Sequence, residues 1–158
     1  MPKSHLEAKQ EQSWIKEELL GSQFGDERLD ERLLKLAGEL SEHPSYPINQ
    51  ASSDWAATKA AYRFFENPRV TPEKILERHY ANTEERILAQ EKVVVVQDSS
   101  TLDFCRHHKT KGLGAIGRME DGFEPQGLLF HTTMAFTDRG LPLGLVDHHI
   151  WARDEDRK

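Results

Sequence analysis

Four consecutive valines at positions 93–96 restrict the fold of this chain more than any other feature of its sequence. β-branched residues favour an extended strand, and a continuous apolar run favours a strand that is covered on both faces. Polar residues follow directly at positions 97–101. We therefore predict a buried strand that ends near Asp98, with this carboxylate at the C-terminal edge, where open α/β sheets place their chemistry.

The charge of the chain limits how it could contact nucleic acid. Charged residues make up 30% of its 158 residues, which predicts much solvated helix surface, and the net charge is −6. Residues 1–92 and residues 93–158 each hold more acidic than basic side chains. Any contact with DNA must therefore come from a local basic stripe and not from the field of the whole protein.

The cysteine content and the composition of the N-terminal residues indicate in which cellular compartment the protein is expected. The single Cys105 excludes an internal disulfide and is typical of a reducing environment. Residues 1–12 contain no apolar segment of the signal-peptide kind, and no apolar run reaches the length of a membrane span. We expect a cytoplasmic protein with no membrane partner, a disordered N-terminus at residues 1–12 and a charged tail at residues 152–158.

Helical patterns occupy residues 13–91, where we expect about four helices. The first spans residues 10–20 and ends at Gly21. Asp26 is the expected N-cap of a second helix at residues 27–40, because its side chain can accept hydrogen bonds from the free N–H groups there. Leucines spaced four, three and four residues apart form one apolar stripe on this helix: Leu29, Leu33, Leu36 and Leu40.

Two further helices follow the rigid, proline-containing loop at residues 44–47. The third begins after Asp54 and ends near Glu66. The fourth runs to about Gln90 and begins at Thr71 and Pro72, a cap followed by proline at the first helical position. One face of the third helix carries Trp55, Lys59, Tyr62 and Glu66.

Three strands are expected in residues 92–151. After the valine strand comes a glycine-rich loop at residues 111–117, then strands at 128–136 and 141–151 joined by a compact hairpin loop at 137–140. Pro142 predicts an irregular start or an edge position for the last strand. The fold class is thus α+β, a helical bundle followed by an incomplete three-stranded sheet, because no later helix covers the sheet.

Three segments in this order carry a resemblance to a known family. They are residues 24–29 (FGDERL), 61–68 (AYRFFENP) and 96–100 (VQDSS), and the loop at 113–117 and His131 fit as well. Together they resemble the N-terminal part of bacterial cut-and-paste insertion-sequence transposases of the Tn-five-like group, from about Trp14 to about Trp151. The resemblance implies a transposase DNA-binding domain over residues 13–91 and the first strands of a ribonuclease-H-like catalytic domain over 92–151.

The resemblance assigns Asp98 as the first carboxylate of an Asp-Asp-Glu triad that binds Mg²⁺, and thus as a catalytic residue and metal ligand. No position of this sequence matches the other two acids. We expect a truncated transposase that is inactive by itself and binds double-stranded DNA at the inverted-repeat ends of a transposon. The alternatives are a non-catalytic protein that binds and inhibits a full-length transposase, or a relic without function. From the residues alone, the preferred interpretation of Asp98 is an acid at the end of its strand that caps a turn through Ser99 and Ser100.

Five basic residues of the helical part are implied as DNA contacts. Arg28 and Arg32 are four residues apart and project from one face of a helix. Ion pairing with Asp30, Glu31 or Glu27 on the protein surface is an equally open reading of these two arginines. Arginine suits DNA because its planar fork binds phosphate or guanine through two hydrogen bonds. The five predicted contacts are Arg28, Arg32, Lys59, Arg63 and Arg69.

Overall fold

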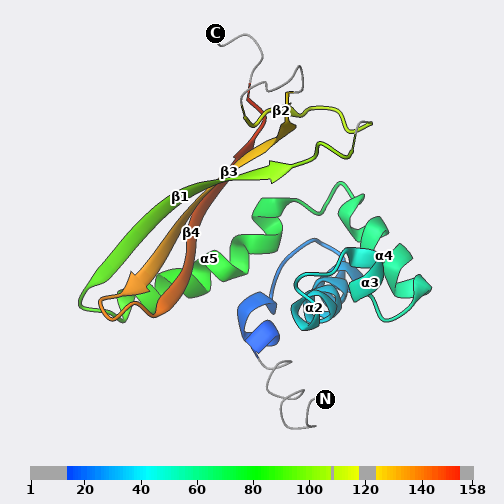
Figure 1. The fold of residues 1–158 in the computed structure, drawn as a ribbon. Coiled ribbons are helices and arrows are strands. Elements are labelled where there is room, and N and C mark those ends of the chain that lie inside the picture. The colour runs from blue at the N-terminus through cyan, green and yellow to red at the C-terminus, as the bar shows by residue number, and fades with distance from the viewer. Residues whose placement is uncertain (1–13, 108, 118–123, 154–158) are drawn as a thin grey trace, which may run out of the picture. The chain divides into compact units, whose positions relative to one another are not determined.

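Helices come first and a sheet follows, as predicted (Figure 1). The computed structural model describes residues 14–107, 109–117 and 124–153. The chain divides into two compact units, Met1–Asn82 and Thr83–Lys158, and each is described by itself. The predicted disorder at residues 1–12 lies outside the described residues, as does most of the charged tail at 152–158. None of the described helices is both long and apolar enough to cross a membrane.

The first unit is helical. A helical stretch at residues 14–19 is followed by α2 (Glu27–Glu42), α3 (Ile48–Ala51), α4 (Trp55–Phe65) and the first part of α5 (Pro72–Leu88). The four predicted helices are confirmed over the described residues, with small shifts at the ends that the structure describes. The short helix α3 was not predicted. It begins directly after Pro47, whose fixed φ of −66° leads the chain into the first turn.

Side-chain caps place the N-termini of α2, α4 and α5. Oδ1 of Asp26 accepts a hydrogen bond from the backbone N–H of Arg28 at 3.1 Å, which confirms the predicted cap of α2. Oδ1 of Asp54 accepts one from the N–H of Ala57 at 2.7 Å and caps α4 in the same way. The predicted cap of α5 is also present, because the side chain of Thr71 accepts a hydrogen bond from a backbone N–H in the first turn of α5. Local residue order therefore decides where these three helices begin.

The core of the first unit forms between α2 and α4. The rings of Phe24 and Phe64 meet edge to face with their centroids 5.6 Å apart. Aromatic pairs prefer this arrangement because the positive edge of one ring meets the negative face of the other. The predicted leucine stripe of α2 supplies the opposite wall. The buried cluster consists of Phe24, Leu33, Leu36, Ala61 and Phe64, with Leu29 and Leu40 packed against it.

Helix α5 holds the end of the helical stretch at residues 14–19. Nδ2 of Asn82 donates hydrogen bonds to the carbonyl oxygens of Glu17 at 2.8 Å and Glu18 at 3.3 Å. The ring of His79, one turn earlier, contacts the carboxylate of Glu18. The last carbonyl groups of a helix have no partner within the helix. Asn82 satisfies two of them and thereby fixes the position of this stretch within the first unit.

The second unit is built on one antiparallel sheet. Its strands are β1 (Val93–Asp103), β2 (Gly114–Ala115), β3 (Gln126–Thr137) and β4 (Pro142–Trp151). β3 is central, with β1 on one side and β4 on the other, while β2 pairs with the first residues of β3. The three predicted strands and the β3–β4 hairpin are confirmed. The described residues add β2 as a fourth strand, within the segment that was predicted to be a loop.

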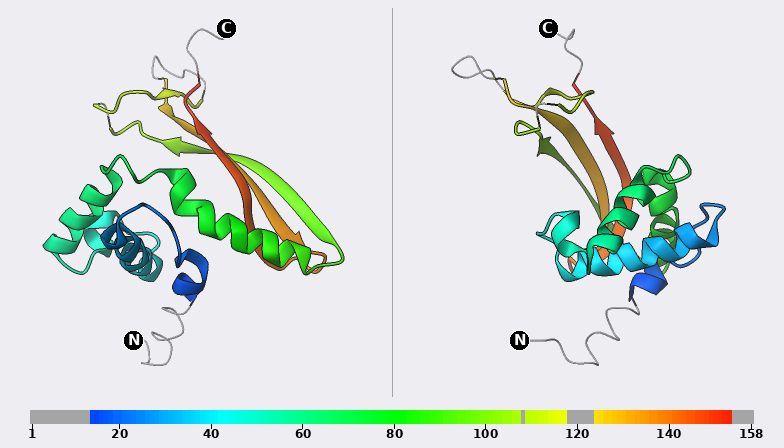
Figure 2. Two further views of the ribbon diagram at one scale, coloured as in Figure 1. Left: turned by 180° about the vertical axis from the view of Figure 1, so that it is seen from behind. Right: turned by 90° about the vertical axis from the view of Figure 1, so that its right-hand side faces the viewer.

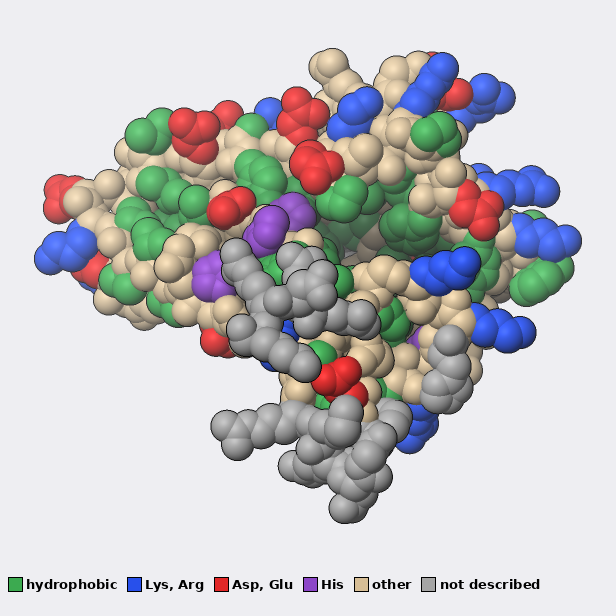
Figure 3. Space-filling model, turned by 90° about the horizontal axis from the view of Figure 1, so that it is seen from above, with side chains coloured by type: hydrophobic (Ala, Val, Ile, Leu, Met, Phe, Trp, Pro, Cys, Tyr) green, Lys and Arg blue, Asp and Glu red, His purple; other side chains and the backbone are tan. Residues whose placement is uncertain are grey.

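The predictions for the valine strand were wrong in two respects. β1 does not end at Asp98 but continues to Asp103, because its backbone pairs with β3 along its whole length. Polar side chains do not interrupt such pairing, since they point away from the hydrogen-bonded edges. The strand is also not covered on both faces, because Val94, Val95 and Val96 are 46%, 57% and 48% exposed. Figure 3 shows hydrophobic side chains open to solvent on the surface it displays.

The end of α5 belongs to the second unit and lies against β4 (Figure 2). Gly144 of β4 has a φ of +144°, and a Cβ atom built on it would collide with the side chain of Thr83. Ala135, which is opposite Gly144 on β3, is completely buried. The absence of a side chain at Gly144 therefore allows the helix to approach the sheet closely.

Candidate nucleic-acid interface

Helix α4 presents an aromatic and basic face to solvent. Trp55 and Tyr62 are 67% and 47% exposed, and Lys59 and Arg63 are exposed beside them. Nζ of Lys59 lies 5.3 Å from the centroid of the Trp55 ring, within the range of a cation–π contact. The opposite side of α4 is anchored in the core by Phe64. The face is thus held on a rigid element. Residues 55–65 of α4 contain no acid, and the exposed Glu66 at the C-cap is the one acidic residue that the sequence places on this face.

A second group of cations lies along α2. Arg28 and Arg32 line one hollow of about 260 Å³ together with Lys35 and Glu31. The two arginines therefore lie on the same side of the helix, as their spacing predicted. Lys35 was not singled out from the sequence, although it follows Arg32 by three residues and continues the same row. These three cations can reach the same ligand, with Glu31 as the one acid among them.

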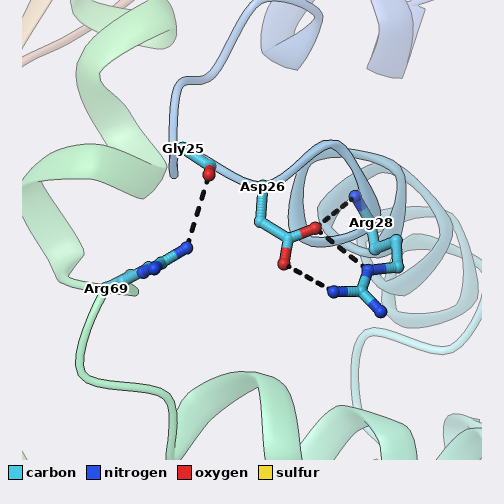
Figure 4. Close-up of polar contacts among 4 residues, drawn as sticks. All are labelled: Gly25, Asp26, Arg28 and Arg69. Carbon is cyan, nitrogen blue, oxygen red and sulfur yellow. Dashed lines mark hydrogen bonds and ion pairs between the residues drawn. The ribbon is translucent and has the colours of Figure 1, made fainter.

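Arg28 forms an ion pair with the residue that caps its own helix (Figure 4). Its Nε donates to Oδ1 of Asp26 at 3.1 Å and its Nη2 donates to Oδ2 at 3.0 Å. The hydrogen bond from Arg28 is the main reason why the pKa of Asp26 is lowered. Arg28 is therefore ion-paired on the protein surface, which was the alternative to DNA contact. Its partner is Asp26 and not one of the acids that the sequence suggested. The Arg28 side chain nevertheless remains 88% exposed, so the pair does not bury the cation.

Arg69 connects the segment after α4 to the start of α2. Its Nη1 donates a hydrogen bond to the carbonyl oxygen of Gly25 at 3.3 Å, and its backbone N–H donates to Oδ1 of Asn67 at 3.0 Å. Figure 4 shows Arg69 and Arg28 on opposite sides of Asp26. Two of the five predicted cations therefore converge on the N-terminus of α2. The positions of all five as DNA contacts remain predictions.

Asp98 lies in the middle of β1 and is exposed. It is opposite Thr132 of β3, which in turn is opposite His148 of β4, so the three residues form one row across the sheet. Within the described residues, no three His, Cys, Asp or Glu side chains come together as a metal site. Asp98 supplies one oxygen ligand of the kind that Mg²⁺ prefers, but the described residues do not make up a complete site. Its catalytic and metal-binding roles remain predictions.

The helical segment matches a known protein family. Residues 11–70 match the family model described as transposase DNA-binding. The matched segment includes α2, α3 and α4 and contains all five predicted DNA contacts, whereas Asp98 lies outside it. This match supports a transposase-related N-terminal region and a DNA-binding role for the chain.

Proposed function

We propose that the first unit recognises the end DNA of a transposon, with the exposed face of α4 in the major groove. The match of residues 11–70 to transposase DNA-binding domains carries this proposal. The geometry supports it, because the exposed face of α4 combines two aromatic rings with two cations, against one acid, Glu66, at the C-cap. An α-helix fits the major groove, where the edges of the bases can be distinguished.

The cations divide into two proposed roles. Arg63 belongs to the exposed surface of the inserted helix and reads a base edge, because a guanidinium can donate two hydrogen bonds to a guanine. Arg32 and Lys35 lie on α2 beside their shared hollow and contact phosphate oxygens. Phosphate contacts position a protein on the duplex, and base contacts provide the sequence preference. Arg28 and Arg69 hold the N-terminus of α2 in place for these contacts.

Substitution of Arg63 tests this assignment. The preferred duplex is first selected from a library of random 30-base-pair duplexes, and affinity is then measured by fluorescence anisotropy against the selected and a shuffled sequence. Arg63→Ala is expected to weaken binding to the selected duplex by about 10- to 100-fold, because one bidentate base contact is worth about 1–3 kcal/mol. Binding to the shuffled duplex should change much less.

Two variants control this experiment. Arg63→Lys keeps the charge and removes the planar fork, so the sequence preference should fall while the salt dependence stays the same. Arg139→Ala removes an exposed cation from the β3–β4 hairpin, outside the matched segment, and should leave both affinities unchanged. An Arg63→Ala protein that binds both duplexes like the unmodified chain would refute the role of α4.

We further propose that the sheet is the opening part of a ribonuclease-H-like catalytic domain of a truncated transposase, with Asp98 as its first carboxylate. The long strands β1, β3 and β4 form an antiparallel meander, and the exposed valines of β1 fit a sheet that packs against further structure. When bound, Mg²⁺ would activate a hydroxyl group for attack on a phosphodiester. Asp98 would contribute one carboxylate oxygen to hold that ion.

Paramagnetic Mn²⁺ tests Asp98 as a metal ligand without any need for catalysis. In ¹⁵N-resolved NMR spectra at millimolar Mn²⁺, we expect line broadening centred on Asp98 and on Thr132 opposite it. Asp98→Asn should abolish this effect, because the amide carries no charge. Asp147→Asn, which alters another exposed acid of the same sheet, should preserve it. Broadening centred elsewhere, or none, would contradict the assignment.

A further inference from the structure

A basic loop joins β1 to β2 in the second unit (Figure 1). Residues 104–113, between these strands, contain the cations Arg106, Lys109 and Lys111 and no acidic residue. The rest of the second unit holds more acidic than basic residues, so the loop has the opposite net charge to its surroundings in the sequence. All three cations are exposed, and among the described residues no carboxylate forms an ion pair with them. Their charge is therefore available to an external anion.

The base of this loop is held by hydrogen bonds to β3. The backbone N–H of Phe104 donates to the carbonyl oxygen of Gln126 at 3.0 Å, and the N–H of Gln126 donates to Sγ of Cys105 at 3.3 Å. Two turns continue the loop, with hydrogen bonds from His107 N–H to the Phe104 carbonyl at 2.8 Å and from Thr110 N–H to the His107 carbonyl at 2.9 Å. A loop that is ordered in advance loses less conformational entropy when it binds.

Asp103, the acid that directly precedes the loop in the sequence, forms a hydrogen bond with the backbone of the loop. Oδ1 of Asp103 accepts a hydrogen bond from the N–H of Cys105 at 2.7 Å. Hydrogen bonds from Cys105 are the main reason why the pKa of Asp103 is lowered, and Arg106 contributes least. Asp103 in turn raises the pKa of the Cys105 thiol, which keeps the sulfur neutral. Asp103 is therefore ionised and attracts Arg106, but no ion pair joins it to the described cations of the loop, and the thiol adds no second negative charge.

The loop also forms a concave surface. Arg106, His107, Lys109 and Thr110 line a hollow of about 350 Å³. Every side chain in this lining can donate a hydrogen bond, and two of them carry a full positive charge. Oxygens of a phosphate group are the matching acceptors, since cations and hydroxyl groups are the common phosphate ligands in nucleic-acid complexes.

We propose that Arg106, Lys109 and Lys111, on the loop between β1 and β2, bind phosphate oxygens of the duplex DNA backbone. The choice of DNA as the polyanion rests on the function proposed above for the first unit. Lysines on a loop act as point charges and carry no fork for base edges, so this contact adds affinity without sequence preference. The second unit thus contributes to DNA binding through a surface outside the segment that matches transposase DNA-binding domains.

The salt dependence of binding tests this proposal with the full chain. Affinity for a shuffled 30-base-pair duplex is measured by fluorescence anisotropy between 50 and 200 mM salt, about the range over which phosphate contacts are lost. The slope of log affinity against log salt concentration is negative, and each phosphate contact increases its magnitude by about 0.9. Lys109→Ala should reduce that magnitude by about 0.9, and the combined Arg106→Ala, Lys109→Ala and Lys111→Ala variant by about 2–3.

Arg139→Ala is the matched control, because it removes one exposed cation from the same unit. Arg139 belongs to the hairpin after Thr137, whereas the basic loop lies beside the first residues of β3. The twelve residues of β3 separate the two places by about 40 Å. This variant should retain the full slope. Circular dichroism should show unchanged folding, since all the substituted side chains are exposed.

The outcomes separate this proposal from the one on which it rests. An unchanged slope in the combined loop variant, together with weaker binding of Arg63→Ala, overturns the loop contact and leaves the role of α4 in place. A smaller magnitude of the slope in Lys109→Ala, with no change in Arg139→Ala, supports the loop contact. If the unmodified chain binds no duplex at 50 mM salt, both proposals fail.

Discussion

Phe64→Ala is expected to make the first unit unfold at a much lower urea concentration than in the unmodified chain. The Phe64 side chain is 1% exposed and packs edge to face on Phe24 at the centre of the core. Replacing a buried phenylalanine by alanine costs about 3–5 kcal/mol, from lost burial and from the cavity that remains. A small domain is stable by only about 5–15 kcal/mol, so a large share of the stability would be lost. DNA binding should weaken as well, because Phe64 anchors α4.

Urea unfolding followed by NMR signals of α2 and α4 measures this loss for the first unit alone. Phe65→Ala is the control, because it removes the same ring from the adjacent position, which is 46% exposed. Its ring contacts Phe64 at a centroid distance of 5.4 Å, so a cost of about 1 kcal/mol is expected. Equal destabilisation by the two substitutions would contradict the core as described.

Gly144→Ala is expected to destabilise the second unit by about 3 kcal/mol or more. The added methyl group would overlap Oγ1 of Thr83 and lie 3.1 Å from its Cβ and Cγ2 atoms. The backbone of Gly144 also has a φ of +144°, which side-chain-bearing residues rarely adopt. Both effects act together, so either α5 must move away from the sheet or β4 must distort. Hydrogen exchange of the amides of β3 and β4 measures the resulting loss of protection.

A second glycine separates backbone strain from the steric clash. Gly140 has a φ of +83°, and nothing lies within 4 Å of a Cβ built on it. Gly140→Ala should therefore cost only the backbone term, about 1–2 kcal/mol. Adding Thr83→Ala to Gly144→Ala should restore part of the stability, since it removes the atoms that collide. If Gly144→Ala cost no more than Gly140→Ala, the close contact between α5 and β4 would be refuted.

The helices could be predicted because their signals are local. Asp26, and Thr71 with Pro72, mark helix starts within a few residues, and the leucine stripe of α2 follows from a spacing of 3.6 residues per turn. The strands β3 and β4 were equally clear, since two apolar runs are separated by a short loop that contains Gly140. In each case the residues that determine the element are neighbours in the chain.

The extent of β1 and the existence of β2 could not be predicted in this way. Both depend on pairing with β3, whose residues lie more than ten positions away in the sequence. The polar residues after Asp98 resemble the end of a strand, yet their backbone groups find partners on β3. β2 has only two residues, Gly114 and Ala115, and neither has a strong preference for strands.

The candidate DNA interface was predicted in part. Spacing placed Arg28 and Arg32 on one face of α2, and Trp55, Lys59 and Tyr62 on one face of α4. It did not reveal that Arg28 pairs with Asp26, since residues two apart do not face each other within a regular helix and this pair forms around a cap. The link from Arg69 to Gly25 joins positions 44 residues apart, and only the packing of the first unit brings them together.

The sequence by itself determined the order of helices and strands, the caps and turns between them, and the positions of the cations. These features follow from backbone preferences and side-chain periodicity, which act over a few residues. Only the tertiary structure decided that Val94–Val96 stay exposed, that Gly144 meets Thr83, and that the basic loop is held on β3 through Gln126. These features depend on which distant segments pack together, because burial and pairing are properties of the neighbours that a residue acquires on folding.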